Sequence, residues 1–98
     1  MSKREAIIRY RLILSQLRKN PATFEEISDF LERESVVQGY DFNISKRTFD
    51  RDCADIASIF GIEVRYDFSI RKYRMEMHEA PDIRERFLEA LDVMSAFN

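Results

Sequence analysis

Several residue types are scarce in this 98-residue chain, and each shortage excludes a class of structure or chemistry. Two glycines and two prolines form no low-complexity linker, and no glycine-rich loop is present to hold a phosphate. The single cysteine, Cys53, can form no internal disulfide. The single histidine, His78, has no second histidine or cysteine at metal-ligand spacing. We therefore expect no metal, no cofactor and no enzymatic activity.

The chain also lacks the long apolar runs that membrane insertion and secretion require. It contains no stretch of about 18 apolar residues, and its N-terminus lacks the apolar segment of a signal peptide. With 45% hydrophobic residues, its length suits one compact domain with a modest core. We expect a cytoplasmic protein with no membrane partner.

Charge is abundant, at 35% of residues, and it is unevenly distributed. The net charge of −2 is poor support for nucleic-acid binding. However, residues 1–20 carry six basic residues and one acid, whereas residues 21–44 carry six acids and one arginine. A surface with basic charge on one side attracts phosphate even when the net charge of the protein is negative. The distribution of charge along the chain therefore favours nucleic-acid binding more than the net charge does.

The stretch from Ile44 to Gly61 predicts the helix around which the chain is organised. Ser45 suits the N-cap position, and Gly61 suits the left-handed position after the last turn. Arg47 and Arg51 stand one turn apart near the start of this helix, the part of a recognition helix that reaches base edges. Two arginines on an outer helix face are more often simply solvated. The apolar stripe is Phe49, Cys53, Ile56 and Phe60, and the opposite face is Arg47, Arg51, Ala54 and Ser58.

Two further helices precede this one. Apolar spacing predicts the first over about residues 3–19, ended by Pro21. The second begins with a capping box, Thr23 with Glu26, and ends before Gly39. The bridge to the third helix, residues 40–43, could add a short strand. The predicted buried face of the second helix is Phe24, Ile27, Phe30, Leu31 and Val37.

After the third helix the periodicity changes from 3.6 to 2, which predicts an antiparallel hairpin over residues 62–77. Arg71 and Lys72 lie at its expected tip, and Arg65 and Arg74 lie on its outer face. These cations could contact DNA phosphate, although polar residues alternate on any half-exposed hairpin. Three helices followed by a hairpin predict an α+β fold, the winged helix-turn-helix, in which the hairpin is the wing.

The last segment, residues 79–98, predicts an extra C-terminal helix, a linker or dimerisation element beside a DNA-binding domain of residues 1–78. On the first helix, Ile8 and Leu12 point away from the expected core, and outward apolar side chains of this kind need a partner. We expect the last helix either to pack on them or to pair with a second subunit in a homodimer. Its stripe includes Ile83, Phe87, Leu91 and Met94.

The octapeptide from Ser45 to Asp52, with the flanking helices and hairpin, resembles the N-terminal winged helix of the bacterial WYL-domain transcriptional regulators, within a wider DeoR-like group. Recognition helices of that family typically read Ser-x-Arg-Thr-x-x-Arg-Asp, and five positions match here. The resemblance covers nearly the whole chain and implies duplex-DNA binding, with residues 45–60 in the major groove. It implies that Asp52 holds an arginine or a backbone group in place. The residues that it implies at the DNA are Ser45, Lys46, Arg47, Thr48 and Arg51.

Two features depart from that family. Position 50 is Asp, where a neutral or longer polar residue is expected. Its carboxylate could accept a hydrogen bond from a cytosine amino group, or pair with a neighbouring arginine and weaken binding. The family's sensor domain does not follow in this chain, which has no tryptophan. Ligand sensing is therefore not assigned to it.

Two hypotheses remain from different classes. The first is the sequence-selective duplex-DNA-binding module of a transcriptional regulator. The alternative is a winged helix that mediates protein assembly without reading DNA, which the near-neutral charge, the spare apolar stripes and the acidic Asp50, Asp52 and Asp55 favour. Salt dependence distinguishes them, because a phosphate-contacting domain loses DNA affinity steeply as salt rises.

Overall fold

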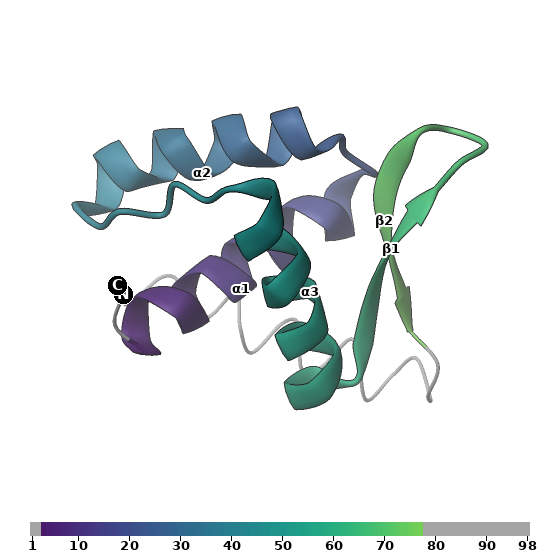
Figure 1. Ribbon diagram of the computed structural model, residues 1–98. Helices are drawn as coiled ribbons and strands as arrows, with labels where there is room; N and C mark the ends of the chain where they lie inside the picture. The colour runs from purple at the N-terminus through teal and green to yellow at the C-terminus, as the bar shows by residue number, and fades with distance from the viewer. Residues whose placement is uncertain (1–2, 78–98) are drawn as a thin grey trace.

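The computed structural model describes residues 3–77, which form an α+β fold of three helices followed by a two-stranded antiparallel hairpin (Figure 1). This arrangement is consistent with a generic winged-helix layout. The expected helix over 79–98, with Ile83, Phe87, Leu91 and Met94, lies outside the described residues, as does the expected boundary after residue 78. The elements are α1 (Lys3–Lys19), α2 (Phe24–Gln38), α3 (Lys46–Phe60), β1 (Ile62–Asp67) and β2 (Lys72–Met77).

The predicted capping residues set the helix boundaries. Thr23 Oγ1 accepts a hydrogen bond from Glu26 N at 3.1 Å, and Glu26 Oε1 accepts one from Thr23 N at 2.9 Å. This backbone hydrogen bond from Thr23 lowers the pKa of Glu26. Ser45 is the N-cap of α3, and Gly39 and Gly61 close α2 and α3 with left-handed φ values of 75° and 65°. All three helix predictions are thereby confirmed.

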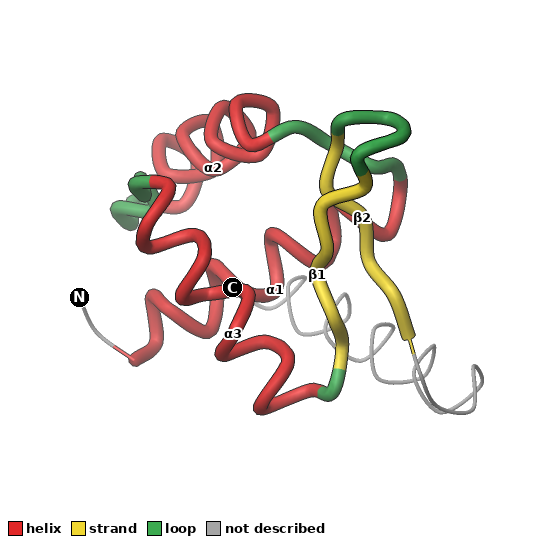
Figure 2. Tube along the Cα trace, turned by 45° about the vertical axis from the view of Figure 1, so that its right-hand side comes forward, coloured by secondary structure: helices red, strands yellow, loops and turns green. Residues whose placement is uncertain are grey.

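The core lies where α1 meets α2, α3 and β2. Figures 1 and 2 show the hairpin at one edge of the three helices. Burial of apolar area supplies most of the favourable free energy of such a core. The fully buried large side chains are Ile13, Leu14, Ile27, Leu31, Phe42, Phe49, Ile56 and Ile62.

Three apolar side chains do not lie where the sequence predicts. Ile8 and Leu12, expected on the outward face of α1, are each only 5% exposed and belong to the core. They offer no exposed surface to a second subunit, and their contact with the last helix stays a prediction. Val37, expected in the core, is 78% exposed. Phe42, in the loop after α2, is buried instead, and its N–H donates to Ser35 Oγ at 2.8 Å.

The hairpin has a regular register in which Ile62 pairs with Met77 and Asp67 with Lys72. A single bridge extends this two-stranded sheet. Ala22 N donates to Tyr73 O at 3.0 Å, and Tyr73 N donates to Ala22 O at 2.7 Å. The extra strand suggested for residues 40–43 is therefore absent there, and the segment just before α2 pairs with β2 instead.

Replacing Phe42 with Ala should lower the free energy of unfolding by about 3–5 kcal/mol, because a fully buried aromatic ring is lost from the core. Val37→Ala should change it by less than about 0.5 kcal/mol, because that side chain is solvated. Urea denaturation followed by circular dichroism measures both. If Val37→Ala lowers the free energy of unfolding more than Phe42→Ala does, Val37 belongs to the core, as the sequence predicted.

Candidate nucleic-acid interface

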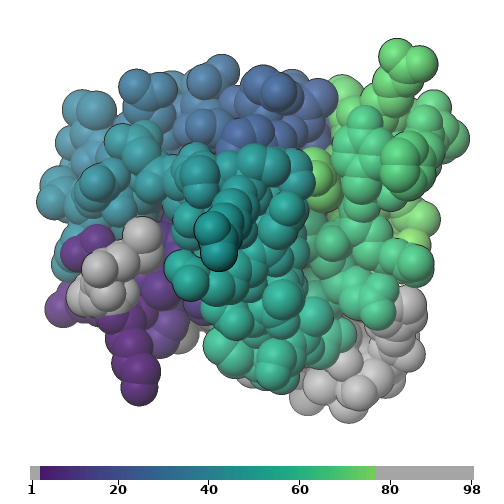
Figure 3. Space-filling view, viewed as in Figure 1, coloured from purple at the N-terminus to yellow at the C-terminus, as the bar shows by residue number. Residues whose placement is uncertain are grey.

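One face of the molecule is formed by α3 with the hairpin beside it (Figure 3). The predicted outward face of α3 is confirmed: Arg47, Arg51, Ala54 and Ser58 are all exposed, whereas Phe49 on the opposite side is fully buried. An α-helix with this profile has the width that the DNA major groove accepts.

Lys46 and Asp50 are engaged with each other on this face. Their Nζ and Oδ1 atoms lie 2.6 Å apart, and the hydrogen bond to Asp50 raises the pKa of Lys46. Lys46 Nζ also stands 5.5 Å from the centre of the Tyr73 ring and 5.9 Å from that of Phe49. The partner of Asp50 is thus a lysine, where the sequence suggested an arginine or a cytosine. Within α3 the two charges offset each other.

Arg47 and Arg51 are differently placed. Both side chains are exposed, and within residues 3–77 neither has a hydrogen-bond or ion-pair partner. Together with Thr48 they line a hollow on the outer face of α3. A guanidinium fork can donate two parallel hydrogen bonds to guanine O6 and N7 or to a phosphate. These two arginines are therefore the side chains of α3 best placed to bind an external acceptor.

Ser45 and Thr48, expected at the DNA, stabilise the first turn of α3. Ser45 Oγ accepts from Thr48 N at 3.1 Å and donates to Thr48 Oγ1, also at 3.1 Å. The first amides of a helix carry partial positive charge, which favours an anion nearby. The two residues thus fix the end of α3 at which Arg47 projects.

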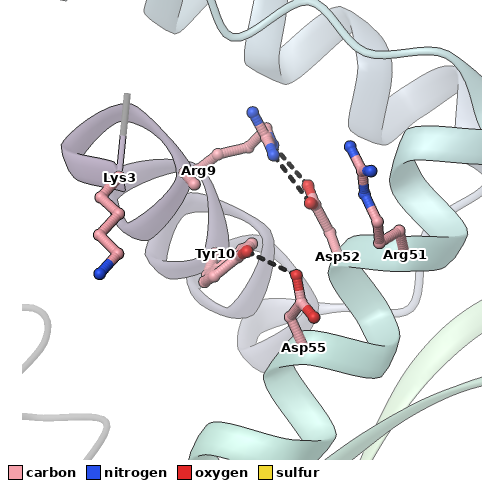
Figure 4. Close-up of a pocket in the computed structure, with 7 residues that line it drawn as sticks. Lys3, Arg9, Tyr10, Arg51, Asp52 and Asp55 are labelled. Atoms are coloured by element: carbon pink, nitrogen blue, oxygen red, sulfur yellow. Dashed lines mark hydrogen bonds and ion pairs between the residues drawn. The ribbon is translucent and has the colours of Figure 1, made fainter. Parts of the chain in front are cut away.

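Two polar contacts attach α3 to α1 (Figure 4). Arg9 donates to Asp52 through both Nε and Nη2, the latter at 2.7 Å from Oδ1, and the two residues are only 2% and 1% exposed. One turn further along α3, Tyr10 Oη donates to Asp55 Oδ2 at 2.8 Å. These four residues line a second hollow, between α1 and α3, together with Lys3 and Arg51.

Arg9 was not predicted as a site residue, since it counted only among the six basic residues of segment 1–20. Arg11 is also buried, at 6% exposure, so the basic N-terminal segment contributes less to the external field than its composition suggests. One signal was present in the sequence: Asp52 borders the apolar stripe of α3, and a buried carboxylate needs a cation. Nothing in the spacing indicated which of the six basic residues of segment 1–20 that cation is.

The outer face of the hairpin neutralises its own charge. Arg65 bonds Glu76 at 3.1 Å and also lies near Glu63, while Arg74 bonds Asp67 at 3.1 Å and Glu76 at 2.6 Å. Cross-strand pairs of opposite charge of this kind stabilise a sheet. Arg65 and Arg74 are therefore committed within the hairpin, which makes them poor candidates for phosphate contacts.

The two cations expected at the hairpin tip differ in their surroundings. Arg71 is exposed and has a left-handed φ of 55°. Lys72 is half-buried beside Pro21 and Glu26, and its charge helps to lower the pKa of Glu26. Arg71 is thus the freer cation of the two.

No protein-family model, no curated protein and no solved structure matches this chain. In the part of the chain that the structure describes, no cluster of His, Cys, Asp and Glu side chains is arranged to hold a metal ion. None of the helices in residues 3–77 combines the length and apolar composition needed to cross a bilayer. A function must therefore be inferred from the residues and geometry described above.

Removing one partner of the buried ion pair should be strongly destabilising. Arg9→Met leaves the Asp52 carboxylate buried without its cation, and we expect a loss of about 3–5 kcal/mol. Arg9→Met combined with Asp52→Leu should recover most of this loss, because no charge is then buried. The matched control is Asp50→Asn in the exposed Lys46–Asp50 pair, which should cost less than about 1 kcal/mol. Urea denaturation of the three variants and the wild-type protein measures these losses. A loss for Arg9→Met as small as that for Asp50→Asn would mean that the pair does not hold α3.

Tyr10 should make stability fall at high pH. Burial, and then its hydrogen bond to Asp55, raise the pKa of Tyr10 from 10.0 to about 12. Between these values the unfolded chain loses the phenolic proton and the folded chain keeps it, so the free energy of unfolding falls as pH rises, by on the order of 2 kcal/mol.

Tyr10→Phe should lower stability by about 1 kcal/mol at neutral pH, because the hydrogen bond is lost, and should flatten this alkaline decline. Tyr40→Phe is the control, because the Tyr40 hydroxyl has no hydrogen bond in residues 3–77. Denaturation curves collected from pH 8 to pH 12 test the difference, and an equal decline in both variants would contradict it.

Proposed function

We propose that this chain is the sequence-selective duplex-DNA-binding module of a cytoplasmic transcriptional regulator, with α3 in the major groove and the hairpin as a wing. The observation that carries the proposal is the outward face of α3. There Arg47 and Arg51 stand one turn apart, exposed, with no acid paired to either in residues 3–77. Arginine bound to guanine O6 and N7 is the commonest base-specific contact in DNA recognition.

The packing that fixes α3 on the core favours base-specific contacts over non-specific binding to phosphates. Phe49 and Ile56 are fully buried under α3, and the Arg9–Asp52 pair fixes its inner side to α1. Directional hydrogen bonds to base edges need a helix that neither rolls nor slides. A merely electrostatic anchor has no such requirement.

The octapeptide from Ser45 to Asp52 points to the same function. Its resemblance to the WYL-domain, DeoR-like regulators implies that Asp52 holds an arginine or a backbone group in place, and the pair with Arg9 fits that role. One domain of this size offers few base contacts. We therefore propose binding as a homodimer on two half-sites, with residues 79–98 as the dimerising segment.

A second candidate function, a winged helix for protein assembly, has specific support. The outer face of the hairpin is self-neutralised, and Val36, Val37 and Ile59 are exposed apolar side chains on α2 and α3. An assembly function that uses these apolar side chains gives no role to the exposed Arg47 and Arg51. DNA binding is therefore the preferred proposal.

Selection from a pool of random duplex DNA, with sequencing of the bound fraction, tests the proposal. The wild-type protein should enrich a motif. Arg47→Ala and Arg51→Ala should each relax preference at one base position, by a factor of roughly 5 to 150, which corresponds to about 1–3 kcal/mol per bidentate contact. Arg33→Ala, an exposed arginine on α2, is the matched control and should leave the motif unchanged.

The outcomes separate the candidate functions. An enriched motif that all three variants retain would remove the base-reading role from α3. Salt-dependent binding without enrichment would indicate a phosphate-only anchor. If the folded protein binds no duplex at low salt, the assembly function becomes the better account.

A further inference from the structure

The tip of the hairpin exposes an aromatic ring. Phe68, the first residue after β1, is 83% exposed, and its neighbours Tyr66 and Ile70 are exposed as well. Isolated apolar side chains on a surface need no explanation, but three within five residues at the end of a projecting hairpin form a local patch. In Figure 3 the hairpin projects beyond the outline of the helices at the upper right.

The exposed ring is joined to the core by a chain of edge-to-face aromatic contacts. The ring centres of Phe68 and Tyr66 lie 4.8 Å apart, those of Tyr66 and Tyr73 5.1 Å, and those of Tyr73 and Phe49 5.0 Å. Phe49 is fully buried in α3. The wing and α3 therefore share one packed aromatic chain, and Phe68 is held at its outer end.

The loop that presents Phe68 is ordered by local contacts. Asp67 Oδ1 accepts from Ser69 N at 2.9 Å and from Ser69 Oγ at 2.6 Å, while Arg74 bonds the other oxygen. Arg71 closes the loop with a φ of 55°, a conformation that residues with a side chain rarely adopt. Backbone strain of this kind concentrates at functional sites, so an arginine at a position suited to glycine motivates a role for its guanidinium.

The hairpin tip lies toward the same end of the molecule as the first turn of α3. β1 begins directly after α3 and runs back alongside it, so the hairpin tip and the first turn of α3 are at the same end (Figures 1 and 2). The distance of 5.5 Å from Lys46 Nζ to the Tyr73 ring confirms this proximity. A duplex bound along α3 would meet the tip at its flank.

We propose that Phe68 is a wedge that inserts between two base pairs in the minor groove flanking the site read by α3, with Arg71 against the adjacent phosphates or groove floor. The inference depends on the DNA-binding function proposed above and deepens it. Apolar side chains inserted at a base step partly unstack it and kink the duplex, which lets more of the protein contact DNA. Because pyrimidine–purine steps are the easiest to kink, such a wedge would prefer them without making any hydrogen bond to the bases.

The surroundings of Phe68 favour DNA over a protein partner. Arg71 is an exposed cation in the same loop as Phe68, and no acid within residues 3–77 is paired with it. A loop that carries both an exposed aromatic ring and a cation suits a base stack bordered by phosphates. Val36 is equally exposed, at 83%, but lies in the last turn of α2, which carries no basic residue.

The test uses duplexes that carry the motif enriched by the wild-type chain, with the fluorescent base aminopurine placed at successive steps beside it. Binding of the wild-type protein should raise the fluorescence at one step, and energy transfer between dyes at the duplex ends should report a bend. Phe68→Ala should abolish both signals and weaken binding by roughly tenfold, while the enriched motif in contact with α3 stays the same. Val36→Ala is the control of equal exposure and should change nothing.

Arg71→Gly gives a second, independent readout. Glycine relieves the left-handed backbone, so the melting temperature should stay equal or rise, while affinity for the same duplex falls severalfold. A purely structural role for the tip would leave affinity unchanged.

The outcomes distinguish the wedge from the proposed function. If the wild-type protein binds its motif but Phe68→Ala binds and bends it equally well, the wedge is wrong and DNA reading stands. If Phe68→Ala alters self-association in sedimentation experiments and not DNA bending, the tip is a contact between copies of this chain. If no duplex is bound at all, both inferences fail together.

Discussion

The buried ion pair between Arg9 and Asp52 is the contact on which the orientation of α3 depends. Two charges held at 2% and 1% exposure have left water at a large desolvation cost, which good geometry and close packing must offset. Successive helix residues project roughly 100° apart. With Asp52 fixed toward α1, Arg51 must project sideways and outward, and Arg47, four residues earlier, must share its face. The buried pair thus acts together with the buried Phe49 and Ile56 to fix which side chains α3 presents.

The same logic of pairing explains how a chain of net charge −2 can present a local positive surface. Arg9 is neutralised in the core, Lys46 by Asp50, and Arg65 and Arg74 by acids of the hairpin. The cations left without acid partners in residues 3–77 include Arg47 and Arg51 on α3, and Arg71 at the tip. Few, well-placed positive charges suit selective binding, because a dense basic surface binds phosphate whatever the sequence.

Features that depend on neighbours in the chain could be predicted from the sequence, whereas features that depend on distant partners could not. The caps at Thr23 and Ser45 and the exposed face of α3 follow from local hydrogen bonding and helical spacing. Arg9 and Asp52 are 43 positions apart, and periodicity carries no information about such a contact.

The residues at the edges of elements show the same limit. Helical spacing grouped Ile8 with Leu12 and led to the expectation that they need a cover, which agrees with their 5% exposure. Spacing could not show that they belong to the core, since burial depends on the rest of the chain. The pairing of Arg65 with Glu76 depends on hairpin register, and the four-residue loop of 68–71 carries none of the usual turn signals. Phe68 escaped notice because alternation does not extend into a loop.

Lys46 links these parts more closely than its place in the octapeptide suggests. Its hydrogen bond to Asp50 and its position over Phe49 and Tyr73 join the first turn of α3 to the second strand of the hairpin. From Tyr73 the ring contacts continue through Tyr66 to the exposed Phe68. A displacement of the tip on binding would therefore be felt at the start of α3, where Arg47 projects. The hairpin and α3 are therefore joined by one continuous set of side-chain contacts.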